Sequence, residues 1–547
     1  MRDYDEITSF LGEWGPFQKT IFALLSLSSI PNGYGAMCMV FLSDTPRHHC
    51  SLPYLNTTGY NQSQALPMEE VNGQLDYSRC TRYKRLNVTE LMFGNETERC
   101  VDGWDYSTER YISTMTTEWN LVCGDAWKVP FSLSVFFMGV FTGSILCGQV
   151  SDRFGRKFIF FLSLAVQTIF TIIQVVSVSW EMFAILYFIV GVGQISNYIT
   201  AFILGNEVLG ESYRLAFSTM GMCVFYAVGY TVLPLFAYFI RSWRILLLVL
   251  ALPGFLYMPL WWFIPESPRW LLAEGRLKEA EDIVRAAAEK NGVRPPAVIF
   301  REEDSAKLLE KQTDHPKTSY TYLDLVRTSK IRNITILNVI LWFSVTISYM
   351  GLSLSTPNMN GDPYLNCLLS AVMELVAYTG AWLMLKVVSR RHIISSTLLL
   401  AGAVLLLTQM VPEKWSSVIV GLAMVGKLGV TGAFSVMYIS AMELYPTVVR
   451  GMGVGVCSMT SKMGSVSAPF LAFMGAYYKA LPYIVMGLLS LAIGLLSLLL
   501  PETRGTALPE DLSQVQSLNW WSHREHLAEP AGVECGFLIY DLCSCLL

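Results

Sequence analysis

Several ionisable side chains stand inside long apolar runs of this sequence. Glu374, Lys427 and Lys462 are flanked by apolar residues, and Glu443 lies near the end of another such run. A charge costs several kcal/mol in hydrocarbon, so such groups are usually paired or functional. Lys462, one turn after Ser458, has the most specific chemistry, because a fixed positive charge attracts carboxylates and repels simple cations. Alternatively, the Lys462 side chain extends to the membrane surface or pairs with a carboxylate of the protein.

Aromatic residues recur at helical spacing in the same part of the chain. Phe434 and Tyr438 are one turn apart, and a preceding apolar run carries Trp342 and Tyr349. Aromatic faces bind quaternary ammonium groups by cation–π attraction. The alternative interpretation is packing between helices, which also uses aromatic residues at this spacing.

Amide and hydroxyl side chains are concentrated in the first part of the chain. Hard cations such as sodium prefer oxygen ligands, so these residues are candidates for a sodium site. Two of them, three residues apart, share one helix face. The alternative role is hydrogen bonding between helices. The candidate sodium ligands are Asn32 (after Pro31), Gln167, Gln194, Asn197 and Tyr198. The sequence has no Cys/His cluster of the kind that binds transition metals.

The sequence contains twelve apolar segments that must hold these side chains. A helix needs about 20 apolar residues to cross a bilayer core. Polar stretches interrupt the series after the first and sixth segments, at 43–128 and 264–330. We therefore expect an all-α membrane protein with twelve transmembrane helices in two six-helix halves. The segments are 18–42, 129–150, 158–177, 182–206, 215–239, 244–263, 331–355, 364–386, 392–411, 416–441, 453–476 and 481–500.

The composition agrees with a surface that faces a lipid bilayer. Of the 547 residues, 53% are hydrophobic and 15% are charged, whereas soluble domains have about 25% charged residues. The net charge of −4 gives no bulk basic field, which argues against nucleic acid as a partner. The acidic residues among the first 17 do not fit a cleavable signal peptide.

The polar stretch 43–128 carries two marks of the secretory side of a membrane. Glycosylation sequons are used in the secretory lumen, and disulfides persist in oxidising compartments. We therefore expect this loop outside the cell, both termini in the cytoplasm and a multi-pass protein of the plasma membrane. Four cysteines allow two disulfides in three pairings, and the sequence does not choose among them. The sequons are at Asn56, Asn61, Asn87 and Asn95, and the cysteines are Cys50, Cys80, Cys100 and Cys123.

These features predict five parts in the chain. Within the linker, residues 271–290 are rich in Ala, Glu, Lys and Arg, which predicts an amphipathic cytosolic helix. The parts are a cytosolic N-terminus (1–17), a first half (18–263), a cytosolic linker (264–330), a second half (331–500) and a cytosolic tail (501–547).

A charged pair recurs in the two halves. Glu207 and Arg214 follow the fourth segment, and Glu443 and Arg450 follow the tenth, 236 residues later. Such pairs at the cytosolic helix ends can bridge neighbouring helices and hold an inner gate shut. They would favour the outward-facing state by forming only in it. The alternative role is a fixed brace of the fold.

The same offset relates other positions. A Pro-Glu pair follows the sixth segment at 265–266 and the twelfth at 501–502, again 236 residues apart. Two matches at one offset indicate duplicated six-helix halves in parallel arrangement. The offset also relates Lys462 to Tyr226, which a pseudo-twofold axis would place across a central cavity. Tyr226 is therefore a candidate contact for the same ligand.

Several motifs resemble known transporters. GQVSDRFGRK at 148–157 matches the G-x-x-x-D-R-x-G-R-K/R signature of the major facilitator superfamily, which adds Asp152, Arg153 and Arg156 to the gate candidates. PESPRW at 265–270 resembles organic-ion and sugar transporters. The chain resembles the organic cation/carnitine (OCTN) subfamily over about residues 1–510, but not over 511–547. The motifs that resemble this subfamily are MRDYDE at 1–6, FLGEWGPF at 10–17, GQISNY at 193–198 and ELYPTVVR at 443–450.

The resemblance implies import of zwitterions or cations that bear quaternary ammonium, such as carnitine or ergothioneine, by alternating access. In that subfamily zwitterion import is coupled to sodium, and no other cofactor is implied. Carnitine-type members carry Arg where this chain has Lys462, and cation-only relatives carry an acid. Lys keeps the charge but loses the two-pronged donor geometry of Arg, which affects affinity or selectivity.

Other functions are weighed against this one. Sodium-independent uptake of organic cations or ergothioneine stays open, and the gate motifs in both halves argue against a receptor that no longer transports. No nucleophile–base set or metal spacing indicates an enzyme. The GNEVLGES run at 205–212 has P-loop spacing, but Glu211 stands where Lys should be. The tail cysteines Cys535, Cys543 and Cys545 are candidates for palmitoylation.

Overall fold

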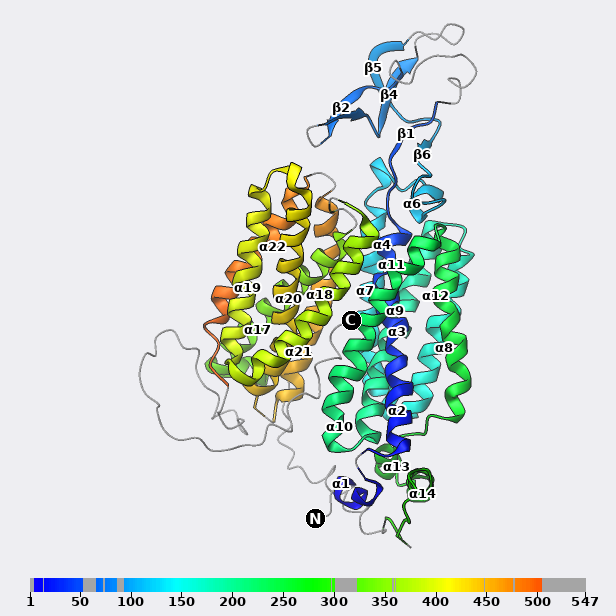
Figure 1. Cartoon of the computed structure of the whole chain (residues 1–547), viewed down its shortest axis with the longest axis vertical. Coiled ribbons are helices and arrows are strands. Elements are labelled where there is room, and N and C mark those ends of the chain that lie inside the picture. The colour runs from blue at the N-terminus through cyan, green and yellow to red at the C-terminus, as the bar shows by residue number, and fades with distance from the viewer. Residues whose placement is uncertain are drawn as a thin grey trace.

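The computed structural model is a bundle of long helices with short antiparallel strand pairs at one end (Figure 1). We call this end the strand end. The opposite end, which we call the linker end, carries α13 (Pro268–Ala273) and α14 (Leu277–Asn291). The structure describes residues 4–12, 14–52, 65–71, 74–85, 93–296, 298–300, 322–356, 359, 361–446, 448–475 and 478–503.

The helices of the first half lie together in Figure 1, coloured from blue to green. A π-helical stretch (Phe217–Val224) and a 3-10 turn (Met258–Trp262) interrupt the α-helical segments. The helices are α2 (Pro16–Leu27), α3 (Ser29–Met37), α4 (Met39–Leu42), α7 (Lys128–Phe154), α8 (Arg156–Val175), α9 (Trp180–Val208), α10 (Glu211–Ala216), α11 (Phe225–Phe239) and α12 (Trp243–Tyr257).

The second half forms a separate group of helices, preceded by the short α16 (Asp324–Arg327). Among the described residues, eleven helical segments are long and apolar enough to cross a membrane. The twelfth expected span, α21, packs inside the bundle but is more polar, because Ser, Thr, Gly and Lys replace apolar residues along it. The helices are α17 (Ser329–Leu354), α18 (Pro363–Val387), α19 (Arg390–Leu407), α20 (Ser416–Leu444), α21 (Arg450–Met474) and α22 (Ala480–Ser497).

Two glycines let α3 and α11 touch through their backbones. A Cβ atom on Gly33 would lie 2.0 Å from the carbonyl oxygen of Tyr226, and one on Gly229 would lie 2.2 Å from that of Ile30. Small residues allow such close approach where helices have no hydrophobic drive to associate in lipid. This contact fixes the part of α3 that carries Asn32.

The strand end is built from three antiparallel pairs and two disulfides. The bonds join Cys50 to Cys100 and Cys80 to Cys123. Asn95 lies in a strand, whereas the sequons at 56, 61 and 87 lie outside the described residues. The pairs are β1 (His48–Cys50) with β6 (Trp104–Tyr106), β2 (Met68–Val71) with β3 (Gln74–Tyr77), and β4 (Thr81–Arg85) with β5 (Phe93–Arg99); the short α6 (Met115–Glu118) follows.

The linker end begins with a small apolar core of its own. The helix expected at 271–290 is instead two helices, because Gly275 adopts a left-handed φ of +75° between them. Their apolar residues pack against Tyr4 and Phe10 of the N-terminal segment, which contains α1 (Tyr4–Ile7) and a 3-10 turn (Ser9–Leu11). Asn291 accepts a hydrogen bond from the Phe17 amide at 2.9 Å, which ties α14 to the first membrane helix.

Replacing Cys50 with Ser should free the thiol of Cys100 and leave the Cys80–Cys123 bond intact. The bonded cysteines are 50 residues apart in the first bond and 43 in the second. For loops of this length, chain entropy predicts about 4 kcal/mol of stabilisation from each bond. Peptide mapping after thiol labelling of the denatured protein should find label on Cys100. Cys80→Ser is the matched control and should expose Cys123. Label on Cys80 or Cys123 in Cys50→Ser would contradict the pairing.

Candidate functional site

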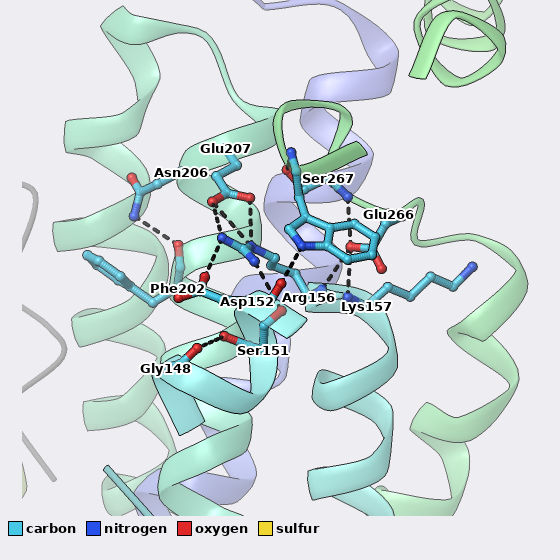
Figure 2. Close-up of polar contacts among 11 residues, drawn as sticks. Gly148, Ser151, Asp152, Arg156, Lys157, Phe202, Asn206, Glu207, Glu266 and Ser267 are labelled. Carbon is cyan, nitrogen blue, oxygen red and sulfur yellow. Dashed lines mark hydrogen bonds and ion pairs between the residues drawn. The ribbon is translucent and has the colours of Figure 1, made fainter. Parts of the chain in front are cut away.

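At the linker end of the first half, four elements meet in one charged network (Figure 2). Arg156 begins α8; its Nε lies 3.2 Å from Glu207 Oε2 on α9, and its Nη2 lies 2.8 Å from Asp152 Oδ1 on α7. Glu266, which follows α12, accepts hydrogen bonds at 3.0 Å from the backbone amides of Arg156 and Lys157. A carboxylate at a helix N-terminus satisfies free amides and is stabilised by the helix dipole.

Gly155 makes this arrangement possible. Its φ of +98° ends α7 and begins α8, and a Cβ atom there would lie 2.6 Å from Glu266 Oε2. Trp270 of α13 closes the same turn, because its indole donates to the Asp152 carbonyl at 2.7 Å. The glycine of the signature motif therefore leaves room for the Glu266 carboxylate.

The second half repeats this network. Arg390 begins α19, and its Nη2 lies 3.2 Å from Glu443 Oε1 on α20. Glu502 accepts hydrogen bonds from the Arg390 amide at 3.3 Å and from the Thr503 amide at 3.2 Å. The Thr503 hydroxyl donates to Glu443. Each ion pair therefore joins helices within one half.

The other predicted gate residues lie close to these networks. Arg214 donates from Nε to the Leu209 carbonyl at 3.0 Å, and Arg450 donates to the Tyr445 carbonyl at 3.3 Å. The two contacts are equivalent, because each arginine folds back onto the end of the preceding helix. Arg153 lies over a neighbouring phenylalanine ring at 5.7 Å.

The predicted aromatic residues of the second half come together. The ring centroids of Trp342 and Tyr438 are 4.3 Å apart, and those of Trp342 and Phe434 are 5.8 Å apart, both edge to face. Tyr349 stacks on Phe434 at 5.5 Å, and the Tyr438 hydroxyl lies 3.3 Å from Ser458 Oγ on α21. We call Trp342, Tyr349, Phe434 and Tyr438 the aromatic cluster.

A buried ion pair adjoins the aromatic cluster. Lys427 Nζ lies 3.0 Å from Glu374 Oε1, and the two side chains are 2% and 0% exposed. Tyr349 donates to the same carboxylate oxygen at 2.8 Å, and Lys427 also donates to Ser370. The sequence identifies both charged residues as unusual. It does not predict that they pair, because they are 53 residues apart on different helices.

Lys462 and Tyr226 differ from Lys427, because the polar atoms at the ends of their side chains have no hydrogen-bond partner among the described residues. Lys462 is 2% exposed, and within the described residues its Nζ has no hydrogen-bond partner. The Tyr226 hydroxyl is likewise buried without a partner, near enough to Glu374 to interact electrostatically. A buried amine without a partner is unfavourable, and a bound anion is one group that can satisfy it and favour its charged form.

Three of the predicted amide residues are linked by hydrogen bonds. Asn32 donates to Asn197 Oδ1 at 3.2 Å, and Gln194 donates to the Asn32 carbonyl at 2.9 Å. Asn197 in turn donates to the Phe160 carbonyl at 3.3 Å. These bonds join α3, α8 and α9, so the interhelical role considered for these amides is present.

Three of the predicted amide residues have side-chain oxygen atoms that remain available. The side-chain carbonyl oxygens of Asn32, Gln167 and Gln194 are buried and have no hydrogen-bond donor among the described residues. Gln167 and Gln194 also line a cavity of about 40 Å³ between α3, α8, α9 and α12. Tyr198 is buried on α9, one residue after Asn197. Unpartnered carbonyl oxygens at one place can coordinate a cation or hold water.

Among the described residues, two helix pairs make the largest contacts between the halves. α7 packs against α21, where Ser134 donates to the Val466 carbonyl at 2.7 Å, and α11 packs against α18. In the second pair the Tyr230 hydroxyl lies 3.2 Å from Ser370 Oγ. The two pairs are equivalent under the internal repeat, since the 236-residue offset relates α7 to α18 and α11 to α21.

A tyrosine of the second half is surrounded by aromatic rings at the strand end. The ring centroid of Tyr364 lies 5.4 Å from Phe41, 5.5 Å from Tyr238 and 6.4 Å from Tyr111. These three partners belong to the first half and its loop. The halves are therefore in contact at the strand end.

Some residues of the candidate site are not evident in the sequence. Arg390 has a detectable signal, because it begins the ninth span as Arg156 begins the third. Tyr364, at the start of an apolar segment, has none, since aromatic residues are common there. Ser370 is equally ordinary, and only the packing of α11 on α18 gives it a role.

Comparison with known proteins gives three similarities. Residues 97–511 match the family described as sugar (and other) transporter. The chain is 49% identical to mouse solute carrier family 22 member 4 over 531 residues, which cover 95% of each chain. It is 48% identical to human organic cation/carnitine transporter 2 over 538 residues, which cover 96% of each chain.

The fold is similar to that of the xylose transporter XylE from E. coli, solved in an inward open conformation. The TM-score is 0.57 at 14% identity, over 90% of this chain and 98% of that chain. This similarity confirms the major facilitator fold expected from the sequence.

Replacing Glu266 with Gln should lower stability by about 1–2 kcal/mol, because a neutral amide accepts weaker hydrogen bonds at a helix N-terminus. Thermal unfolding of the purified protein in detergent would measure this loss. Glu502→Gln is the matched variant and should cost less, because its bonds of 3.2–3.3 Å are longer than those of Glu266. A larger loss for Glu502→Gln, or none for Glu266→Gln, would contradict this ranking.

Proposed function

The chain belongs to the organic cation/carnitine branch of the sugar (and other) transporter family, and from this premise we propose that it imports carnitine-like zwitterions with sodium. Its relatives and fold are those of multi-pass membrane transporters, not of enzymes. The observation that carries the proposed substrate is Lys462, whose buried Nζ has no hydrogen-bond partner among the described residues.

A zwitterion satisfies two needs of the second half. Its carboxylate would neutralise Lys462 on α21, and its quaternary ammonium would lie against the aromatic cluster by cation–π attraction. Ser458 supports this arrangement, because it contacts the aromatic cluster through Tyr438 and precedes Lys462 by one turn on the same helix. Tyr226 would contact the substrate from the first half.

The sodium ion would bind in the first half. The free carbonyl oxygens of Asn32, Gln167 and Gln194 are the proposed ligands, with Asn197 and Tyr198 beside them. Their hydrogen bonds hold α3, α8 and α9 together, so a bound ion would favour one arrangement of these helices. A ligand shifts a conformational equilibrium only through such differential affinity.

Alternating access would proceed by rocking of the halves. We propose that the strand end faces outside the cell, that both termini are cytoplasmic and that the protein acts in the plasma membrane. The disulfides and sequons of loop 43–128 support this orientation. The ring contacts of Tyr364 would close the outer side in the present state. They would break when the cavity opens outward.

The linker-end networks would act as the inner gate. Because the Glu207–Arg156 and Glu443–Arg390 pairs lie within single halves, they fix the shape of each gate surface. The two surfaces would meet when the carrier faces outward. Neutralising either glutamate would then alter turnover more than substrate binding from outside.

A second candidate is sodium-independent uptake of organic cations or ergothioneine. One observation favours it, which is the carboxylate of Glu374 in the middle of the bundle. Lys427 neutralises this carboxylate in the present structure, so we rank this function second.

Lys462→Ala should abolish sodium-dependent carnitine uptake, because it removes the partner of the carboxylate. A charged hydrogen bond contributes roughly 1.5–3 kcal/mol, so we expect at least about a tenfold loss. Lys462→Arg should retain uptake, and Lys462→Asp should favour simple cations. The measurement is uptake of labelled carnitine per molecule at the cell surface. Normal carnitine uptake by Lys462→Ala would refute the proposed role.

Gln194→Ala and Asn197→Ala should raise the sodium concentration needed for half-maximal carnitine uptake. Gln194→Ala removes one proposed ligand oxygen, and Asn197→Ala removes the acceptor that holds the Asn32 amide in place; both leave the second half unchanged. Uptake measured over a series of sodium concentrations, with ionic strength held constant, would report the shift. Ser467→Ala, at a half-buried residue whose hydroxyl bonds only the Met463 carbonyl of its own helix among the described residues, is a control that should behave as the unmodified protein. Unchanged sodium dependence in both amide variants would exclude this site.

A further inference from the structure

The Glu374 carboxylate uses only one of its two oxygens. Oε1 accepts hydrogen bonds from Tyr349 and pairs with Lys427, whereas Oε2 is buried without a donor among the described residues. A buried carboxylate oxygen without a donor is unfavourable. The carboxylate can therefore accept a further N–H group without losing a bond that it already has.

The surroundings of Lys427 are those of a cation-binding site. Its Nζ lies 5.1 Å from the ring centroid of Tyr230 and 5.8 Å from that of Tyr349. Glu374 supplies the negative charge at 3.0 Å. A carboxylate between aromatic faces is the chemistry that binds a protonated amine, and here an amine of the chain itself occupies it.

Lys427 is held in this site from both halves. It donates to Ser370, and the same serine oxygen lies 3.2 Å from the Tyr230 hydroxyl of α11. The site therefore lies where α11 and α18 meet, between the two halves of the carrier. An incoming substrate that reaches the middle of the bundle would approach this interface.

We propose that Lys427 is a specificity-determining residue, which occupies a cation site on Glu374 and thereby excludes primary and secondary amines as substrates. A tethered ammonium competes with a free amine at a high effective concentration. A quaternary ammonium has no N–H group and cannot donate a hydrogen bond to Glu374 Oε2. It is bound better by cation–π attraction to the aromatic cluster. This inference rests on the proposed function for the position of the zwitterion.

Removing Lys427 leaves Glu374 as an uncompensated buried charge, which an external cation can neutralise. Lys427→Gln should therefore gain uptake of labelled phenethylammonium, a primary amine, by at least about tenfold per surface molecule. Uptake of tetraethylammonium, which is quaternary, should rise much less. The matched control is the double variant Glu374→Gln/Lys427→Gln, which removes both charges and should show no gain.

Two results would overturn the proposal. One is no gain of phenethylammonium uptake in Lys427→Gln at normal surface level, and the other is an equal gain in the double variant. If Lys427→Gln does not reach the surface, Ser370→Ala gives the test. That change keeps both charges but loosens Lys427, so it should produce a smaller gain with the same preference for the primary amine, and no gain would refute the proposal.

The unmodified protein separates this inference from the proposed function. If the proposed function is wrong, the unmodified chain will take up no carnitine, whatever phenethylammonium uptake Lys427→Gln shows. Failure of the inference alone would appear as normal carnitine uptake together with no gain of amine uptake in Lys427→Gln.

Discussion

Glu374 and Lys427 bond each other where neither side chain reaches solvent. Burial of charge in a low-dielectric interior is unfavourable unless partners compensate it, and this constraint governs the arrangement of the second half. Tyr349 and Ser370 form hydrogen bonds with the pair, and the other rings of the aromatic cluster pack together with Tyr349. Lys462, by contrast, has no such partner within the part of the chain that the structure describes.

The linker end meets the same constraint with repeated parts. In each half a glutamate after the last helix accepts from the backbone at the start of another helix, from two amides in the first half and one in the second. An arginine at that start pairs with a third helix. Desolvated helix ends would otherwise leave amides without partners. The two halves therefore hold their linker-end helices together by the same kinds of contact.

The sequence predicts the helices well, because lipid requires each span to be long and apolar. It identifies α21 despite its polar residues, since the length and the repeat both require a helix there. The prediction of one continuous helix in the linker is wrong, because Gly275 separates two helices there. Spacing alone does not reveal that Glu207 and Glu443 bond Arg156 and Arg390, since these partners come from other helices. The aromatic cluster was predictable from helical periodicity, whereas the Glu374–Lys427 bond depends on how α18 and α20 are rotated.

The crossing of α3 and α11 has a consequence for inherited variation. At Gly33 and Gly229 the helices meet backbone to backbone, so even the methyl group of alanine has no room. Asn32, a neighbour of the first glycine, takes its position from that crossing. Alleles that add a single carbon at either glycine would therefore be expected among loss-of-function alleles, although neither position carries a charge.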